Sequence, residues 1–189
     1  MYRYYFQLMV LIAMSLGLSS AANAQSDSKN SLPAFPKDWL GNWSGQLHIY
    51  NQSGMVQELD IELVLQEIKV DSMYQWSIKY ITPDRVDERK YFLLKGNGEA
   101  NHWVVDEDNG ILLDGYVLAN RFYLLFDVMD SRIQTSYTLE KDKLIFENLA
   151  SRVPPVNTSG GIQKDSTEIP TVNSYTVVNL QKAILSKTD

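Results

Sequence analysis

The sequence predicts an all-β protein, an antiparallel up-and-down barrel of about 8–10 strands with a short helical turn before strand one. Three observations predict it. Apolar and polar residues alternate with a period of two along most of the chain, turn-forming pairs separate the alternating segments, and no long amphipathic helix follows residue 24. Sequential hairpins leave two open edges unless the sheet closes on itself, which favours a barrel. A two-sheet sandwich is the alternative that the same alternation allows.

The expected strands follow one another at short intervals. Residues 37–41 are expected to form the helical turn, closed by a glycine, and residues 43–50 the first strand. The clearest strand covers residues 59–66, where leucine and isoleucine alternate with acidic and polar residues. Asn109-Gly110 is the strongest short hairpin signal in the chain. The other strands are expected over residues 74–80, 91–94, 102–105, 111–118, 122–128, 133–139 and 144–146.

Two segments precede the expected domain, which covers residues 35–185. Residues 1–24 have the features of a cleaved signal peptide: one arginine, an apolar run from Leu8 to Leu18, and Ala22-Asn23-Ala24 as the cleavage site. The apolar run is shorter than the roughly 20 residues that span a bilayer. Residues 25–34 are expected to form a flexible leader. We therefore expect an exported protein, periplasmic or extracellular, that does not span the membrane after cleavage.

The segment between Ser151 and Pro170 differs from the rest in composition. It holds paired prolines, Gly160-Gly161 and several small polar residues, with few apolar ones. We expect one long loop here, followed by a last strand over residues 171–182 that returns to the sheet. A loop of this length is uncommon unless it is functional or disordered.

Composition excludes several classes of function. The 189-residue chain has 17 basic and 23 acidic residues, and removing residues 1–24 takes away one arginine, so the net charge changes from −6 to −7. This acidic balance, without runs of lysine or arginine, argues against nucleic acid as a partner. The chain has no cysteine, so neither a disulfide nor a lipidated cysteine can form.

Few residues offer catalytic or metal-binding chemistry. The chain has two histidines, His48 and His102, too few without cysteine for the usual zinc sites. No Gly-x-Ser-x-Gly elbow presents a nucleophile. The acidic run Asp106-Glu107-Asp108 beside a turn is typical of a solvated hairpin tip. We therefore expect no catalytic residue, no metal and no cofactor. An enzyme that uses carboxylates or tyrosines inside the barrel is the least favoured hypothesis.

The stretch from Phe35 to Gly45 resembles the start of calycin-type barrels, the lipocalins and their lipocalin-like relatives. There a short helical turn leads to a Gly-x-Trp motif on the first strand, here Gly41-Asn42-Trp43. The resemblance implies that Trp43 plugs the closed end of the barrel and that a basic residue late in the chain packs over it. Lys182 is the candidate for that residue and Arg152 a poorer one. The haem-binding branch uses a histidine near the C-terminus, which this chain lacks.

Several aromatic residues fall on the expected inward face. A barrel of this size can hold one small ligand between such side chains, although the same aromatics could simply fill the core. The sequence thus predicts a non-enzymatic protein that holds a small hydrophobic or amphipathic ligand. The alternative is an accessory protein that uses the barrel as a scaffold and the 153–170 loop or outer surface for a protein partner. The expected cavity residues are Tyr74, Trp76, Phe122, Phe126 and Tyr137.

Overall fold

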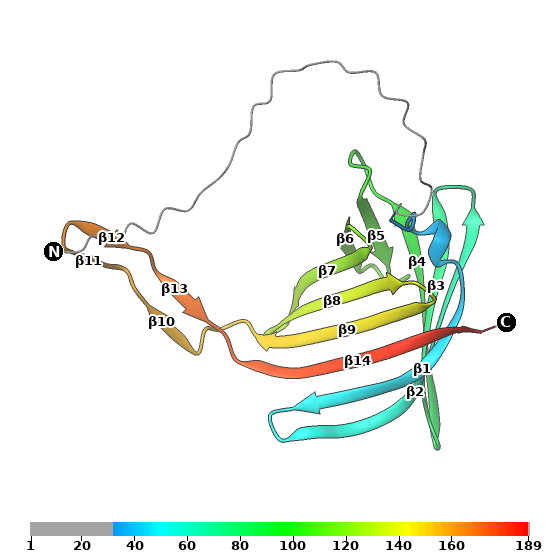
Figure 1. Cartoon of the computed structure of the whole chain (residues 1–189), viewed down its shortest axis with the longest axis horizontal. Coiled ribbons are helices and arrows are strands. Elements are labelled where there is room, and N and C mark those ends of the chain that lie inside the picture. The colour runs from blue at the N-terminus through cyan, green and yellow to red at the C-terminus, as the bar shows by residue number, and fades with distance from the viewer. Residues whose placement is uncertain (1–31, 189) are drawn as a thin grey trace, which may run out of the picture. The chain divides into compact units, whose positions relative to one another are not determined.

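The computed structural model describes residues 32–188, which fold as a closed antiparallel barrel of ten strands (Figure 1). This confirms the predicted fold class, including the helical turn. The proposed signal peptide and residues 25–31 of the leader lie outside the described residues. In chain order the elements are η1 (Lys37–Trp39), β1 (Gly41–Asn51), β2 (Gly54–Lys69), β3 (Met73–Thr82), β4 (Arg85–Lys95), β5 (His102–Asp106), β6 (Leu112–Leu118), β7 (Arg121–Val128), β8 (Ser131–Glu140), β9 (Lys143–Arg152), β10 (Asn157–Ser159), β11 (Ile162–Lys164), β12 (Thr167–Ile169), β13 (Val172–Ser174) and β14 (Val177–Thr188).

β14 closes the barrel. Strands β1 to β9 pair in sequence order, and β14 lies between β1 and β9. Its pairing with β1 runs from Asn51 opposite Asn179 to Asn42 opposite Thr188, while its other edge pairs with β9. Closure therefore removes both of the open edges that a ten-stranded meander would expose.

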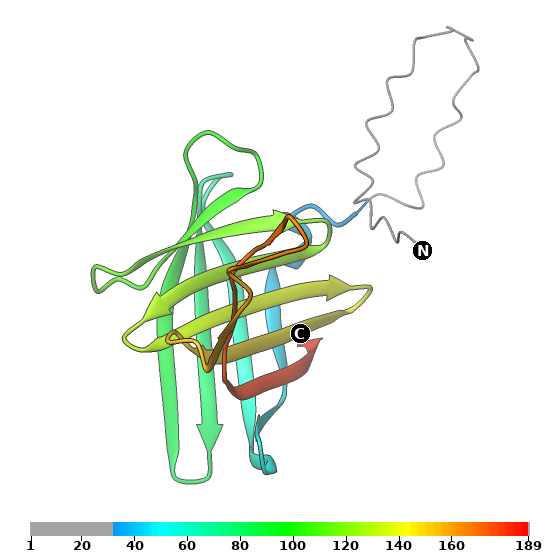
Figure 2. The ribbon, with the colours of Figure 1, turned by 90° about the vertical axis from the view of Figure 1, so that its left-hand side faces the viewer.

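The connections divide the barrel into two ends. The β1–β2, β3–β4, β5–β6 and β7–β8 turns lie at one end, here called the mouth, and the β2–β3, β4–β5, β6–β7 and β8–β9 turns lie with η1 at the opposite end, the closed end. In Figure 2 the β1–β2 and β3–β4 turns lie together at the lower end of the barrel. Alternation along each strand then decides which side chains face the interior.

Aromatic side chains pack the closed end. Trp39 of η1 is fully buried, and its backbone carbonyl accepts a hydrogen bond from the Trp43 indole at 2.9 Å. Phe35 contacts the rings of Trp39, Trp103 and Phe122 at centroid distances of 4.8–5.4 Å. Burial of each such side chain contributes about 1.5–3 kcal/mol. The closed end therefore supplies much of the hydrophobic core.

Residues 151–170 are not the single loop that composition predicts. They contain β10, β11 and β12, and with β13 these form a twisted two-part ribbon, here called the arm, covering residues 153–176. Figure 1 shows the arm continuing from the ends of β9 and β14. Positive φ angles at Asp165 and Ser166 form the tight turn at its tip. The last strand accordingly begins at Val177, not at residue 171.

Among the described residues, no helix has the length and apolar character needed to cross a membrane.

Candidate ligand site at the barrel mouth

The mouth half of the barrel is hollow. A cavity of about 400 Å³ lies there between the inward faces of β1 to β4, β9 and β14. A second, smaller cavity of about 110 Å³ adjoins it and shares Tyr80, Arg89 and Asn148 with it. The larger volume falls in the range typical of small-molecule sites. Its lining residues are Leu47, Ile49, Gln57, Leu59, Tyr80, Thr82, Arg85, Asp87, Arg89, Asn148 and Gln181.

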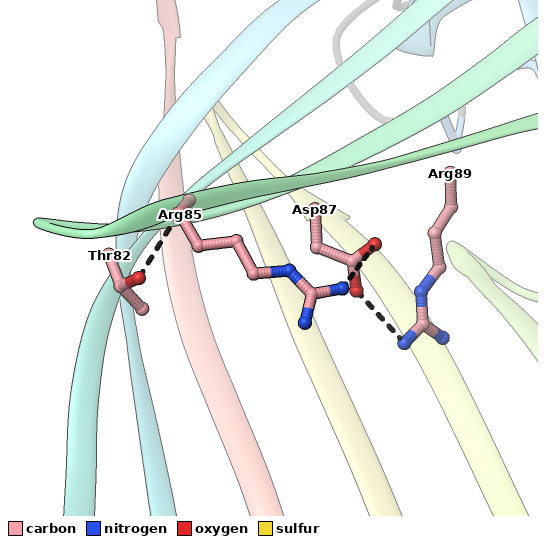
Figure 3. A network of polar contacts seen from close by, with 4 residues as sticks. All are labelled: Thr82, Arg85, Asp87 and Arg89. Atoms are coloured by element: carbon pink, nitrogen blue, oxygen red, sulfur yellow. Dashed lines mark hydrogen bonds and ion pairs between the residues drawn. The ribbon is translucent and has the colours of Figure 1, made fainter.

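Three charged side chains of β4 face this cavity. Arg85, Asp87 and Arg89 share the inward face with Leu93, which is fully buried deeper in the barrel. Figure 3 shows the three projecting from the same face of β4. The Asp87 carboxylate lies between the guanidinium groups, with one oxygen 3.8 Å from Nη2 of Arg85 and the other 3.4 Å from Nη2 of Arg89. Both distances exceed those of strong charge-assisted hydrogen bonds.

Arg89 is held beside two tyrosines. Its guanidinium lies over the Tyr80 ring, 5.2 Å from the centroid. Burial alone would lower the pKa of Arg89, but the Tyr91 hydroxyl, together with Tyr80 and Asp87, outweighs burial and raises it. The side chain keeps about half of its surface accessible. Arg89 is therefore a fixed positive charge that a molecule in the cavity can reach.

The tyrosines around the cavity stay protonated. Burial raises the pKa of both Tyr80 and Tyr91, although Arg89 acts in the opposite direction on each. Burial also raises the pKa of Tyr137 well above its ordinary value. These phenols can therefore donate hydrogen bonds to a ligand at neutral pH.

Leucine and isoleucine side chains of β1 and β2 line another part of the cavity, together with Gln57 of β2. Leu47 is buried, and Ile49 and Leu59 are half-buried beside it. The amide of Asn148 donates to the Thr135 hydroxyl at 3.0 Å, which fixes one polar group between the two cavities. The cavity thus presents a cationic side on β4 and an apolar side on β1 and β2.

The histidines lie outside this arrangement. His48 and His102 face outward on their strands and pair with Glu58 at 3.0 Å and Asp114 at 2.8 Å. Within residues 32–188 no cluster of three or more histidine, aspartate or glutamate side chains is placed to hold a metal ion. The geometry of the mouth supports binding and orientation of a molecule.

No family model matches the chain, and no curated protein does. Among solved structures, the chain is similar to an S-type phycobiliprotein lyase from Guillardia theta, with 8% identity, a TM-score of 0.56, and 79% of this chain and 88% of that chain covered. It is also similar to a protein of unknown function from the DUF3598 family of Nostoc punctiforme, with 12% identity, a TM-score of 0.54, and 84% and 51% covered. These likenesses support a lipocalin-like barrel. At such identities they bear on the fold alone.

The predicted cavity residues are divided between the two halves of the lipocalin-like barrel. Trp76, Phe126 and Tyr137 line the smaller cavity. Tyr74 and Phe122 are buried in the closed end instead, where Tyr74 contacts the Trp103 ring at 5.8 Å and Phe122 stacks on Phe35. A role of any of the five in binding stays a prediction.

Lys187, and not Lys182, lies over the tryptophan of the Gly41-Asn42-Trp43 segment. Its Nζ is 5.5 Å from the Trp43 ring centroid, and the two residues are opposite each other on β14 and β1. Lys182 has the opposite parity, faces outward and pairs with Glu147 at 3.1 Å. A Cβ on Gly41 would collide with Cε of Lys187, so the glycine leaves room for the lysine stem.

Arg152 is not near Trp43 either. It lies at the mouth, where its guanidinium pairs with Asp130 at 2.7 Å. Both corrections have the same cause, because the position of a side chain depends on strand register and parity, which sequence distance from Trp43 does not give.

The charged residues of the site were missed by sequence reasoning. Residues 85–90 are mostly charged, so the alternation of apolar and polar residues predicts this strand only from residue 91 onward. The signal was parity: counting back by two from Leu93 through Tyr91 places Arg89, Asp87 and Arg85 on the inward face.

Proposed function

We propose that this protein binds a small amphipathic molecule in the mouth of its barrel and is not an enzyme. The observation that carries the proposal is the cavity of about 400 Å³, with one cationic and one apolar side, in a barrel whose other end is fully packed. A preformed concave site with a few polar groups among apolar ones is the usual form of a small-molecule site. Its polar groups would orient a ligand.

Native mass spectrometry of residues 25–189, purified without denaturation, tests this proposal. The result expected is an additional mass of one small molecule that disappears when the protein is denatured, or that can be restored by offering amphipathic compounds. The proposal is wrong if the protein stays bare when it is offered fatty acids, haem and naphthalene dyes at concentrations above those that saturate typical binding proteins.

We also propose that the protein is exported. The support is the composition of residues 1–24, where a charged start, an apolar run and Ala22-Asn23-Ala24 follow in order. N-terminal sequencing of the protein from the periplasmic fraction and the medium would give Gln25 as the first residue. Recovery of a chain that begins at Met1, from the cytoplasm only, would contradict export.

A second candidate function is docking of a protein partner on the arm. Residues 154–175 contain no buried side chain, and Val156, Ile162 and Val172 are exposed. The short strands of the arm pair only with one another among the described residues, so their outer edges could accept an extended segment of a partner. A photo-crosslinking side chain at position 162 would identify such a partner. Its purified form should then bind the intact protein but not a variant without the arm; equal binding to both would exclude this function.

A further inference from the structure

We propose that the mouth cavity selects ligands that carry an anionic group, such as a carboxylate, sulfonate or phosphate, and that Arg85 and Arg89 bind it. This inference rests on the proposed function, since it names the chemical class of the ligand for the same cavity. It concerns residues that the sequence pattern alone did not single out.

Arg85 and Arg89 carry more hydrogen-bond donors than the protein around them satisfies. Each guanidinium carries five N–H donors, and both arginines share the single carboxylate of Asp87. Among residues 32–188, Arg89 has two hydrogen-bond partners, Asp87 at 3.4 Å and the Tyr91 hydroxyl, and neither satisfies all five of its donors. Most of these N–H donors therefore have no partner of opposite charge among the described residues. A planar, bidentate acceptor suits them, because guanidinium geometry matches carboxylate and phosphate oxygens.

The charge of the larger cavity differs in sign from that of the whole chain. The whole chain has a net charge of −6, yet the larger cavity is lined by two cations and one anion. Its positive character is therefore local and opposes the overall charge. Glu107 lines the smaller cavity together with Arg89 and Tyr91, and it is not among the residues that line the larger one.

The two arginines lie where a ligand would enter the cavity. Both lie at the mouth, where their side chains are half or more exposed, whereas Leu47 and Leu59 line the same cavity on neighbouring strands. An amphipathic anion can place its charge against β4 at the mouth while its apolar part contacts β1 and β2. A cationic ligand would meet two guanidinium groups at the same entrance and would be repelled.

Two fluorescent probes of nearly the same shape separate recognition of the anionic group from binding of the apolar rings. 8-Anilinonaphthalene-1-sulfonate carries an anionic group, and N-phenyl-1-naphthylamine has the same ring system without it. We expect the double variant Arg85→Gln/Arg89→Gln to bind the sulfonate about tenfold to a hundredfold more weakly, because charge-assisted hydrogen bonds are lost. Its affinity for the uncharged amine should change less than twofold.

Arg121→Gln is the matched control. Arg121 also lies over a tyrosine ring, 5.7 Å from the Tyr123 centroid, but on the outer face of β7. It should leave the affinity for both probes unchanged, and circular dichroism should show that all variants are folded. Raising the salt concentration should weaken sulfonate binding to the wild-type protein and to Arg121→Gln, but much less to the double variant, since screening acts on the charge of the cavity arginines.

The outcomes separate the anion preference from the existence of the ligand site. Binding of both probes that the double variant weakens equally, or not at all, would overturn the anion preference and leave the cavity as a ligand site. Failure of both probes to bind the wild-type protein, with no displaceable small molecule present, would overturn the ligand site and the anion preference together.

Discussion

Side chains on the inward face of β4 change from apolar to charged within a few positions. Leu93 is fully buried, Tyr91 is half-buried, and Arg89 exposes about half of its side chain to the cavity. Because successive inward residues lie about 6.6 Å apart along a strand, this series measures depth in the barrel. Single residues thus divide the interior into a packed half that stabilises the fold and a polar half that can bind.

Gly45 is expected to be a residue where an added methyl group weakens the barrel. A Cβ there would lie 2.5 Å from the backbone carbonyl oxygen of Ile184, so β1 and β14 would have to separate locally. We expect Gly45→Ala to lower the free energy of unfolding by about 1–3 kcal/mol. Urea unfolding followed by tryptophan fluorescence measures it. Gln46→Ala, exposed on the same strand, is the control; equal stability of the two variants would contradict the close packing of β1 on β14.

Tyr74 is expected to make stability fall at alkaline pH. Burial, with a further contribution from Glu67, raises its pKa from 10.0 to about 12. The unfolded chain therefore loses this proton near pH 10 while the folded chain keeps it, so the stability is fully present below pH 10 and decreases between pH 10 and about 12. Urea unfolding at several pH values measures the slope. Tyr74→Phe should reduce it; identical slopes in the two proteins would be inconsistent with a buried Tyr74.

At the scale of elements, alternation explains which parts of the fold could be predicted. β2 could be recognised because Ile61, Leu63 and Leu65 face the core at every second position. The arm could not be predicted, because its four strands have three residues each and none of these residues is buried. Without a buried face, apolar and polar residues do not alternate along the strands. The inward position of Arg85, Asp87 and Arg89 on β4 could not be predicted for a related reason. These side chains line a cavity at the mouth, so the inward face of the strand is polar there, although it is apolar elsewhere.

The arm is expected to contribute little to the stability of the barrel. Its base is closed by the hydrogen bond from the Arg152 amide to the Thr176 carbonyl at 2.9 Å. Replacing residues 155–174 with an Asn-Gly turn should therefore change the free energy of unfolding by less than about 1 kcal/mol, because few core contacts are lost and the connection becomes shorter. Chemical denaturation compares the two proteins. A loss of several kcal/mol would mean that the arm packs on the barrel in solution.

At the scale of the whole molecule, closure joins the two ends of the described chain. β1 and β14 are the first and last strands, and both meet at the closed end, where Lys187 lies over Trp43. The sequence predicts the closure through the number of strands and the need to cover edges, but it does not predict the register. Register decided that Lys187 and not Lys182 reaches Trp43, and it also aligned the β4 arginines with the cavity.

Closure by β14 has a consequence for a cleaved chain. A protease site introduced between Lys164 and Thr167, at the tip of the arm, allows the backbone to be cut far from the barrel. We expect the two fragments to remain together and to keep the circular dichroism of the intact protein, because β14 pairs with β1 and β9 along its length and buries Ala183 and Leu185. Size-exclusion chromatography before and after urea treatment measures this.

Unfolding of the cleaved protein should depend on its concentration, since refolding then requires two chains to associate. The larger fragment alone should aggregate, because removal of β14 exposes the edges of both β1 and β9. Separation of the fragments without denaturant would show that β14 is held mainly by its covalent connection, and would contradict a barrel whose integrity depends on the pairing of its first and last strands.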